Sequence, residues 1–189
     1  MARKSVEVQV LYRGLIKKHM KYWIITDTHI GHDKLIELGI RQIGVDNKIE
    51  EGLLSIPEED VLIHLGDVGW TKGEMSRIFK SLKCKKILVR GNHDKESNNW
   101  YVEKCGFDFV CMQFRDRING YDILFSHKPW VDVGYDINIH GHFHNNLNPY
   151  QFEPELLAIK NPRQCLVAIE RTEYKPVLLT TIIDSFIKK

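Results

Sequence analysis

The chain has 189 residues, 43% of them hydrophobic, and a formal net charge of +2 at pH 7. This length suits one compact domain, and the small charge excludes a global field that would demand a polyanionic partner. No uninterrupted apolar stretch approaches the roughly 18 residues of a membrane-spanning helix, and the four cysteines form no CxxC pair. We therefore expect a cytoplasmic protein with reduced thiols and no membrane partner.

The first 19 residues precede the first clear strand pattern, which begins just after Met20. Val6, Val8 and Val10 alternate, which is compatible with an edge strand. We favour the other interpretation, in which residues 1–19 are an N-terminal extension outside the core and residues 20–189 form a single domain.

One arrangement then recurs along the chain: a short apolar run, a small residue, and a side chain that can bind a metal ion. Such runs are typical of buried strands, and they are "YWIIT", "VLIHLG", "KILVRG", "YDILFS" and "INIHG". Helical patterns lie between the early runs, in "NKIEEGLLSI", "GEMSRIFKSLK" and "NNWYVEKC". The second of these repeats apolar residues on one helix face, at Met75, Ile78, Phe79 and Leu82. Strand–helix alternation of this kind predicts parallel strand pairing.

The second half of the chain has a different pattern. Asn119-Gly120 stands between two strand-like runs in "FDFVCMQFRDRINGYDILFSH", and this dipeptide is a strong hairpin signal. The segment "CLVAIERTEYKPVLL" predicts a strand or a hairpin, and "LTTIIDSFIKK" predicts a terminal helix. The sequence therefore predicts a mixed α/β fold with helices on the sheet faces.

Polar clusters follow five of the predicted strands, and ligands in open α/β sheets gather at the carboxyl ends of strands. These clusters hold seven candidate metal ligands: Asp27, His29, Asp67, Asn92, His127, His142 and His144. The set exceeds what one ion normally takes from a protein, so we expect two divalent ions about 3.5–4 Å apart that share one carboxylate. Imidazole, carboxylate and amide oxygen together suit borderline divalent ions. We expect Mn, with Fe, Zn, Ni or Co as alternatives.

The same positions resemble the motifs of the calcineurin-like metallophosphoesterases, in their small single-domain form from bacteria, archaea and phages. The DxH, GD, GNHD, GH and GHxH motifs correspond to Asp27-Thr28-His29, Gly66-Asp67, Gly91-Asn92-His93-Asp94, Ser126-His127 and Gly141-His142-Phe143-His144. Ser126 is the one departure, because the fourth motif often has glycine there. The resemblance implies a four-layer αββα sandwich with mixed sheets. It also implies one metal on Asp27, His29, Asp67 and His144, and the other on Asp67, Asn92, His127 and His142.

By the same resemblance, His93 is a catalytic residue that assists the leaving group. Asp94 stands next to it, and we favour a catalytic role in which Asp94 orients the ring of His93; the alternative is that Asp94 only caps a turn. A hydroxide that bridges the two ions would attack phosphorus. The implied activity is hydrolysis of phosphate esters, with phosphodiesters favoured over monoesters, in an open site of limited specificity.

Two other functions stay open. A nuclease or a nucleic-acid end-processing phosphatase is suggested by a basic run, although we favour a solvated helix face; the run comprises Lys72, Arg77, Lys80, Lys83, Lys85, Lys86 and Arg90. A non-catalytic scaffold is the second alternative, and the presence of His93 argues against it.

The remaining histidines and one tryptophan are harder to assign. His32 follows the first ligand pair and is a candidate substrate-binding residue, or else it caps the next helix. Trp130, three residues after His127, lines a substrate pocket or belongs to the core. His64 and His140 lie inside predicted strands, and we expect both to have structural roles.

Overall fold

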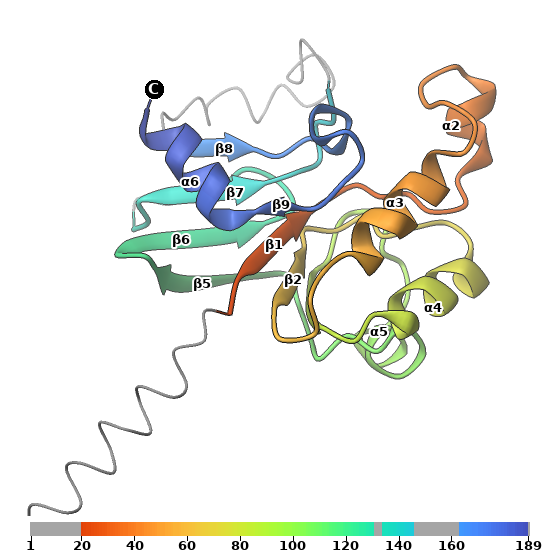
Figure 1. Ribbon diagram of the computed structural model, residues 1–189, viewed down its shortest axis with the longest axis horizontal. Coiled ribbons are helices and arrows are strands. Elements are labelled where there is room, and N and C mark those ends of the chain that lie inside the picture. The colour runs from red at the N-terminus through yellow and green to blue at the C-terminus, as the bar shows by residue number, and fades with distance from the viewer. Residues whose placement is uncertain (1–19, 131–133, 146–162, 189) are drawn as a thin grey trace, which may run out of the picture.

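The computed structural model describes residues 20–130, 134–145 and 163–188. Two β-sheets pack face to face, and helices cover the outer side of one of them (Figure 1). The predicted α/β fold with mixed sheets is confirmed. The proposed extension over residues 1–19 lies outside the described residues, so it stays a prediction.

The first sheet has five strands in the order β4-β3-β2-β1-β9. Four of them are parallel, as the strand–helix alternation predicts: β1 (Tyr22–Ile25), β2 (Val61–His64), β3 (Lys85–Val89) and β4 (Phe109–Cys111). β9 (Val177–Leu178) pairs with β1 in the antiparallel direction. The carboxyl ends of β1, β2 and β3 therefore lie at one edge, where three of the polar clusters follow them.

The second sheet has the order β5-β6-β7-β8 and comprises β5 (Gln113–Ile118), β6 (Tyr121–Ser126), β7 (Ile137–His140) and β8 (Gln164–Leu166). The first two strands form the predicted hairpin, and the other pairs are parallel. Asn119 and Gly120 have φ values of 52° and 87°. A two-residue turn of this type requires the left-handed region at both positions, which explains the hairpin signal.

Two strand predictions were wrong in their extent. The run before the hairpin turn is divided, because β4 belongs to the first sheet and β5 to the second, so the chain crosses between the sheets at Met112. The segment "CLVAIERTEYKPVLL" is no hairpin, because β8 joins the second sheet, a 3₁₀ helix follows at Ile169–Thr172, and β9 joins the first sheet. Alternation of apolar residues predicts a strand but carries no information about its partner.

The described helices are α2 (Asp33–Glu37), α3 (Val45–Leu54), α4 (Lys72–Ser81), α5 (Asn98–Cys105) and α6 (Leu179–Ile187). The last four confirm the predicted helical segments, and α4 buries Met75, Ile78 and Phe79 as its spacing predicts. α2 buries none of its residues and so lacks an apolar period that would reveal it. None of the described helices is long and apolar enough to cross a membrane.

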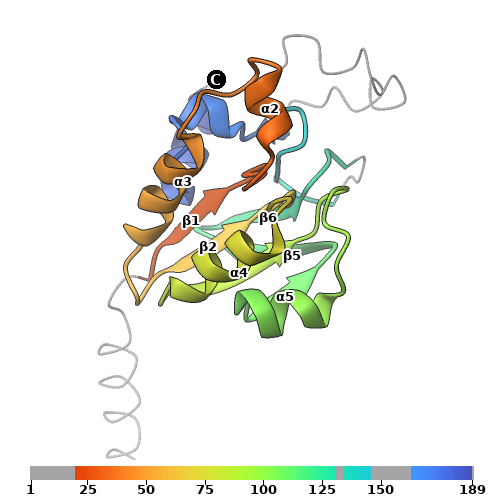
Figure 2. The ribbon, with the colours of Figure 1, turned by 90° about the vertical axis from the view of Figure 1, so that its right-hand side faces the viewer.

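Both faces of the first sheet are covered, which explains the continuous apolar runs in its strands. Ile25 and Leu62 join the core beneath α3, α4 and α5, whereas their neighbours Ile24 and Ile63 join the core between the two sheets. Figure 2 shows α3 and α4 in front of β1 and β2. α6 packs on β1 and β9 and adds Ile182 to the core between the sheets. The described helices thus lie on or beside the first sheet, and a helical fourth layer over the second sheet stays a prediction.

Candidate metal centre

The loops after β1, β2, β3, β6 and β7 carry all seven candidate ligands. Six of these side chains form two groups of three, and within each group the ligand atoms all lie within 4.8 Å of one another. Each group combines side chains from loops of both sheets. The candidate centre therefore lies where the two sheets meet.

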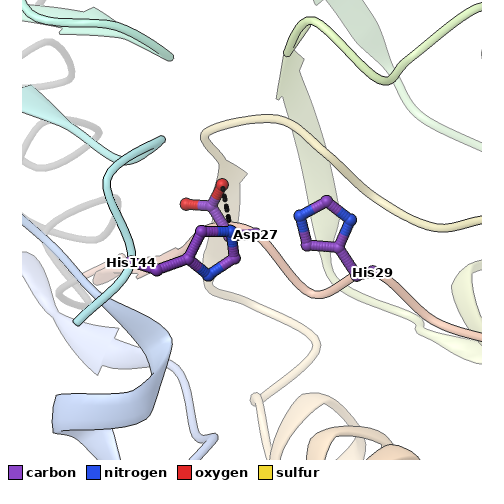
Figure 3. Close-up of side chains that lie close together, drawn as sticks. All are labelled: Asp27, His29 and His144. Carbon is purple, nitrogen blue, oxygen red and sulfur yellow. Dashed lines mark ion pairs between the residues drawn. The ribbon is translucent and has the colours of Figure 1, made fainter. Parts of the chain in front are cut away.

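The first group consists of Asp27, His29 and His144 (Figure 3). His144 Nε2 lies 3.8 Å from Asp27 Oδ1, and the rings of His29 and His144 stack with centroids 5.2 Å apart. Burial lowers the pKa of His29 to about 2, so this imidazole stays neutral and offers a lone pair.

The carboxylate of Asp27 provides a test of whether a cation fits here. Its Oδ2 atom accepts a hydrogen bond of 2.6 Å from Thr26 Oγ1, but Oδ1 is buried and has no hydrogen-bond partner in the described structure. A buried carboxylate oxygen without a partner is costly unless a cation binds it. The first group therefore fits a metal ion.

The second group consists of Asp67, His127 and His142, with Asn92 beside it. His127 Nε2 lies 3.4 Å from Asp67 Oδ2, 3.0 Å from Asn92 Oδ1 and 3.2 Å from His142 Nδ1. Burial lowers the pKa of His127, but the hydrogen bond to Asp67 and the charges of the nearby carboxylates raise it to about 9. The local charge therefore attracts a positive ion, whether a proton or a metal.

Asp67 connects the two groups. Its Oδ2 atom lies 3.7 Å from His29 Nε2 in the first group and 3.4 Å from His127 Nε2 in the second. Its Oδ1 atom accepts a hydrogen bond of 2.8 Å from the backbone N–H of His93, which fixes the orientation of the carboxylate. This is the position that a carboxylate shared by two ions requires.

The backbone is strained where it presents these side chains. Among the described residues, eight non-glycine positions have a positive φ, and five of them are candidate ligands: Asp27, His29, Asp67, His142 and His144. Their φ values run from 45° to 74°, in the left-handed region that costs an L-residue about 1–2 kcal/mol. Such strain persists where the surrounding structure enforces it, and it clusters at functional sites.

Two motif glycines leave room for the carboxylates. A Cβ atom at Gly91 would lie 2.1 Å from Asp67 Oδ1, and one at Gly141 would lie 2.5 Å from Asp27 Oδ2. Real Cβ atoms essentially never come within 3.0 Å of another heavy atom in this way. Each carboxylate therefore keeps its position only against a residue without a side chain.

His93 lies beside the first group but belongs to neither donor group. Its side chain is exposed, and its ring centroid lies 5.5 Å from that of His29 and 5.3 Å from that of Trp70. His32 stacks on Trp70 at 4.1 Å and makes no side-chain capping bond to α2, so the capping interpretation is not supported. The result is an aromatic wall of His32, Trp70 and His93 next to the first group.

Asp94 makes backbone contacts that resemble the alternative, a turn cap, and differ from the favoured role. Its carboxylate accepts hydrogen bonds from the backbone N–H groups of Gly91, Asp67 and Val68 at 2.7, 2.8 and 3.0 Å, and one of 3.3 Å from Tyr101 Oη. These contacts brace the loops after β2 and β3. None of these hydrogen bonds reaches the ring of His93, so the orienting role of Asp94 stays a prediction that this geometry does not support.

Glu170 and Arg41 belong to the surroundings of the centre, and sequence reasoning missed both. Glu170 Oε1 lies 2.9 Å from His144 Nδ1, which leaves Nε2 of that ring on the metal side, and 3.3 Å from Arg41 Nη2. The buried Arg41 guanidinium also donates to the backbone carbonyls of Asp27 and Thr28, at 2.6 Å each. No local motif marks Glu170, because it acts only through the folded structure.

His64 and His140 have the predicted structural positions. His64 is fully buried, accepts a hydrogen bond of 3.1 Å from the backbone N–H of Gly66, and lies 2.9 Å from Thr28 Oγ1. Burial lowers the pKa of His64 to about 3 and that of His140 to about 4. Both rings are therefore neutral at physiological pH.

Most residues of the basic run make polar contacts within the folded protein. Arg77 binds Glu50 with two hydrogen bonds of 2.6 and 2.7 Å, Lys72 pairs with Glu96, and Lys85 pairs with Asp108. Lys86 and Arg90 donate to backbone carbonyls. Most of the run is thus engaged within the protein, which weakens the argument for a nucleic-acid surface.

Comparisons with known proteins agree with this geometry. The sequence model of the calcineurin-like phosphoesterases matches residues 20–169. The chain belongs to this family. The resemblance read from the motifs is thereby confirmed, and this calcineurin-like phosphoesterase is by class a metal-binding hydrolase of phosphate esters.

The chain is also similar to a phage protein and to two solved structures. This chain is similar in structure to AQ665, a protein of unknown function from Aquifex aeolicus, with a TM-score of 0.71 and 31% identity. The match covers 88% of this chain and 100% of AQ665. It is 28% identical over 166 residues to the gene 66 protein of Mycobacterium phage L5, which covers 65% of this chain and 77% of the relative. The match to the structure of an archaeal phosphodiesterase covers 68% of this chain and 76% of the phosphodiesterase chain, at 22% identity and with a TM-score of 0.44.

Proposed function

We propose that the protein is a phosphodiesterase of limited specificity that works with two divalent ions. The observation that carries this proposal is the position of Asp67, 3.7 Å from His29 Nε2 in one donor group and 3.4 Å from His127 Nε2 in the other. A single ion would need only one of these groups. Two groups joined by one carboxylate suit two ions that share it.

Each ion would have four protein ligands. The first is assigned to Asp27, His29, Asp67 and His144, and the second to Asp67, Asn92, His127 and His142. The mixture of imidazole, carboxylate and amide oxygen suits borderline divalent ions. We propose Mn, with Fe, Zn, Ni or Co as alternatives. When bound, two such ions activate water as a nucleophile and neutralise charge on the phosphoryl group.

His93 is assigned the role of proton donor to the leaving oxygen. Its ring lies outside both donor groups and borders a cavity of about 250 Å³ that Trp70, Lys72 and Lys95 also line. Its backbone N–H donates a hydrogen bond to Asp67, which fixes the position of the residue relative to the centre. The ring takes no part in this hydrogen bond and can contact the substrate. A leaving group in this cavity would lie beside a group that can donate a proton.

The test uses the variant His93→Ala and two diesters that differ in leaving group. One releases p-nitrophenolate, which is stable as an anion, and the other releases an alkyl alcohol, which needs a proton. We expect the variant to keep two ions per chain and to lose about 10²–10⁴-fold in rate on the alkyl leaving group, with a smaller loss on p-nitrophenolate. Metal content and both rates are measured on the same preparation.

Three results would argue against the proposal. An equal loss on both diesters would remove the proton-donor role of His93, and loss of metal would make it a ligand. Absence of hydrolysis of bis-p-nitrophenyl phosphate by the wild-type protein with added Mn would instead favour a non-catalytic scaffold. Single-stranded DNA, assayed in parallel, tests the nuclease alternative.

A further inference from the structure

A second cavity borders the candidate centre and has a different character from the one at His93. Its volume is about 390 Å³, and two candidate ligands of the second group, Asn92 and His127, line it together with Met112, Trp130 and Ser126. The cavity at His93 lies beside the first group, since the His93 ring is 5.5 Å from that of His29. The two donor groups therefore each have a cavity next to them.

Two large apolar side chains are left exposed at this second cavity. Met112 is 67% exposed and Trp130 is 48% exposed. Met112 occupies the position between β4 and β5 where the chain crosses from one sheet to the other. Exposed apolar groups that gather beside polar catalytic residues are typical of a binding site, in which apolar walls surround a few polar groups.

The backbone of Trp130 is fixed although its indole ring is exposed. Its N–H donates 2.9 Å to Oδ1 of the fully buried Asn138, and its carbonyl accepts from Tyr135 Oη at 2.6 Å and Gln164 Nε2 at 2.8 Å. Asn138 Nδ2 also donates 2.8 Å to Ser126 Oγ, another residue of the cavity lining. A buried amide thus holds two parts of the wall, so the backbone that carries the ring is already ordered before a ligand binds.

We propose that this cavity binds the ester group that remains on phosphorus after hydrolysis, and that it selects a flat aromatic group such as an aryl or nucleoside ester. This inference rests on the proposed function, because it requires a diester at the centre. The two ester groups of a diester project from phosphorus in different directions, and only one of them departs in the reaction. His93 donates a proton to the departing ester group, and the cavity beside Asn92 and His127 binds the ester group that is retained. A monoester has no second ester group and leaves the cavity empty, which gives the diester preference a structural cause.

The test keeps the leaving group constant and changes only the retained group. Bis-p-nitrophenyl phosphate and methyl p-nitrophenyl phosphate both release p-nitrophenolate, but they retain an aryl and a methyl group respectively. We expect Trp130→Ala to lower the ratio of kcat/KM for the aryl diester to that for the methyl diester by about tenfold, because ring stacking is lost. Trp130→Phe should restore most of the ratio, and Met112→Ala should lower it by a smaller factor.

Trp70→Ala is the matched control. Trp70 is 52% exposed and lines the cavity at His93, where both substrates place the same leaving group. This variant should leave the ratio unchanged whatever it does to the individual rates.

The outcomes are distinguishable. If Trp130→Ala and Met112→Ala both leave the ratio within twofold of wild type, the cavity does not bind the retained group. An equal fall of the ratio in Trp70→Ala would also overturn the assignment. If the wild-type protein hydrolyses neither diester, the proposed function fails and this inference fails with it. Melting temperatures of the variants separate a lost contact from a lost fold.

Discussion

Replacing Gly91 with alanine should disable the candidate metal centre although no ligand residue is replaced. The new Cβ would lie 2.1 Å from Asp67 Oδ1 and 2.5 Å from the backbone N of the same residue, against a closest approach of 3.0 Å for real Cβ atoms. Rotation of the carboxylate cannot relieve the second clash, because that clash involves a backbone atom. The backbone must therefore move by about half an ångström or more. Overpacking of this kind costs about 1–3 kcal/mol of stability.

The larger effect should fall on metal binding, because Asp67 lies between both donor groups. Displacing a ligand or its support typically lowers metal affinity by about 10–100-fold, and a misplacement near 1 Å costs about 10²-fold in rate. We expect Gly91→Ala to contain fewer than two ions per chain at limiting Mn and to lose hydrolysis of bis-p-nitrophenyl phosphate to this extent. Metal analysis and kinetics on the folded variant provide the measurement.

Gly73→Ala is the control for this experiment. Gly73 lies in α4, and a Cβ there would meet nothing within 4 Å. This variant should bind two ions and be as stable as wild type or up to about 1 kcal/mol more stable, since alanine favours a helix. A Gly91→Ala protein with two ions and wild-type activity would show that the carboxylate position is not set by this contact, and the reasoning would be refuted.

The remaining predictions concern Asp67, Glu170, His64 and the N-terminal extension. Asp67→Asn should reduce metal content below two per chain and activity by orders of magnitude, and full activity with two ions would contradict the ligand assignment. Glu170→Gln should raise the Mn concentration needed for half-maximal activity by about tenfold, because the charge that supports His144 is lost. His64 has a folded pKa of about 3, so it stays neutral in the fold and charges when unfolded. Lowering the pH from 7.5 to 5.5 should therefore make this residue subtract about 1 kcal/mol from the unfolding free energy in urea titrations, and His64→Gln should lack this contribution. A protein that starts at Met20 should keep its activity and its melting temperature within a few degrees, whereas a large loss would place residues 1–19 in the core.

The sequence by itself determined which side chains are candidate ligands and the edge of the sheet at which they lie. Asp27, Asp67 and His127 each follow an apolar run, and the short length and β-branched residues of these runs favour buried strands. The hairpin at Asn119 was equally readable, since its turn depends on two adjacent residues. These features are local in sequence, so a short window contains the information that specifies them.

The tertiary structure alone decided how these parts support one another. Arg41 and Glu170 are 129 positions apart and yet share a contact, and β4 and β5 enter different sheets although one residue separates them. Asp94 lies beside His93 in the sequence but directs its carboxylate to the backbone of the loop at Asp67. Contacts of this kind leave no period or motif, because their energy depends on pairing between segments that only the packing of the two sheets brings together.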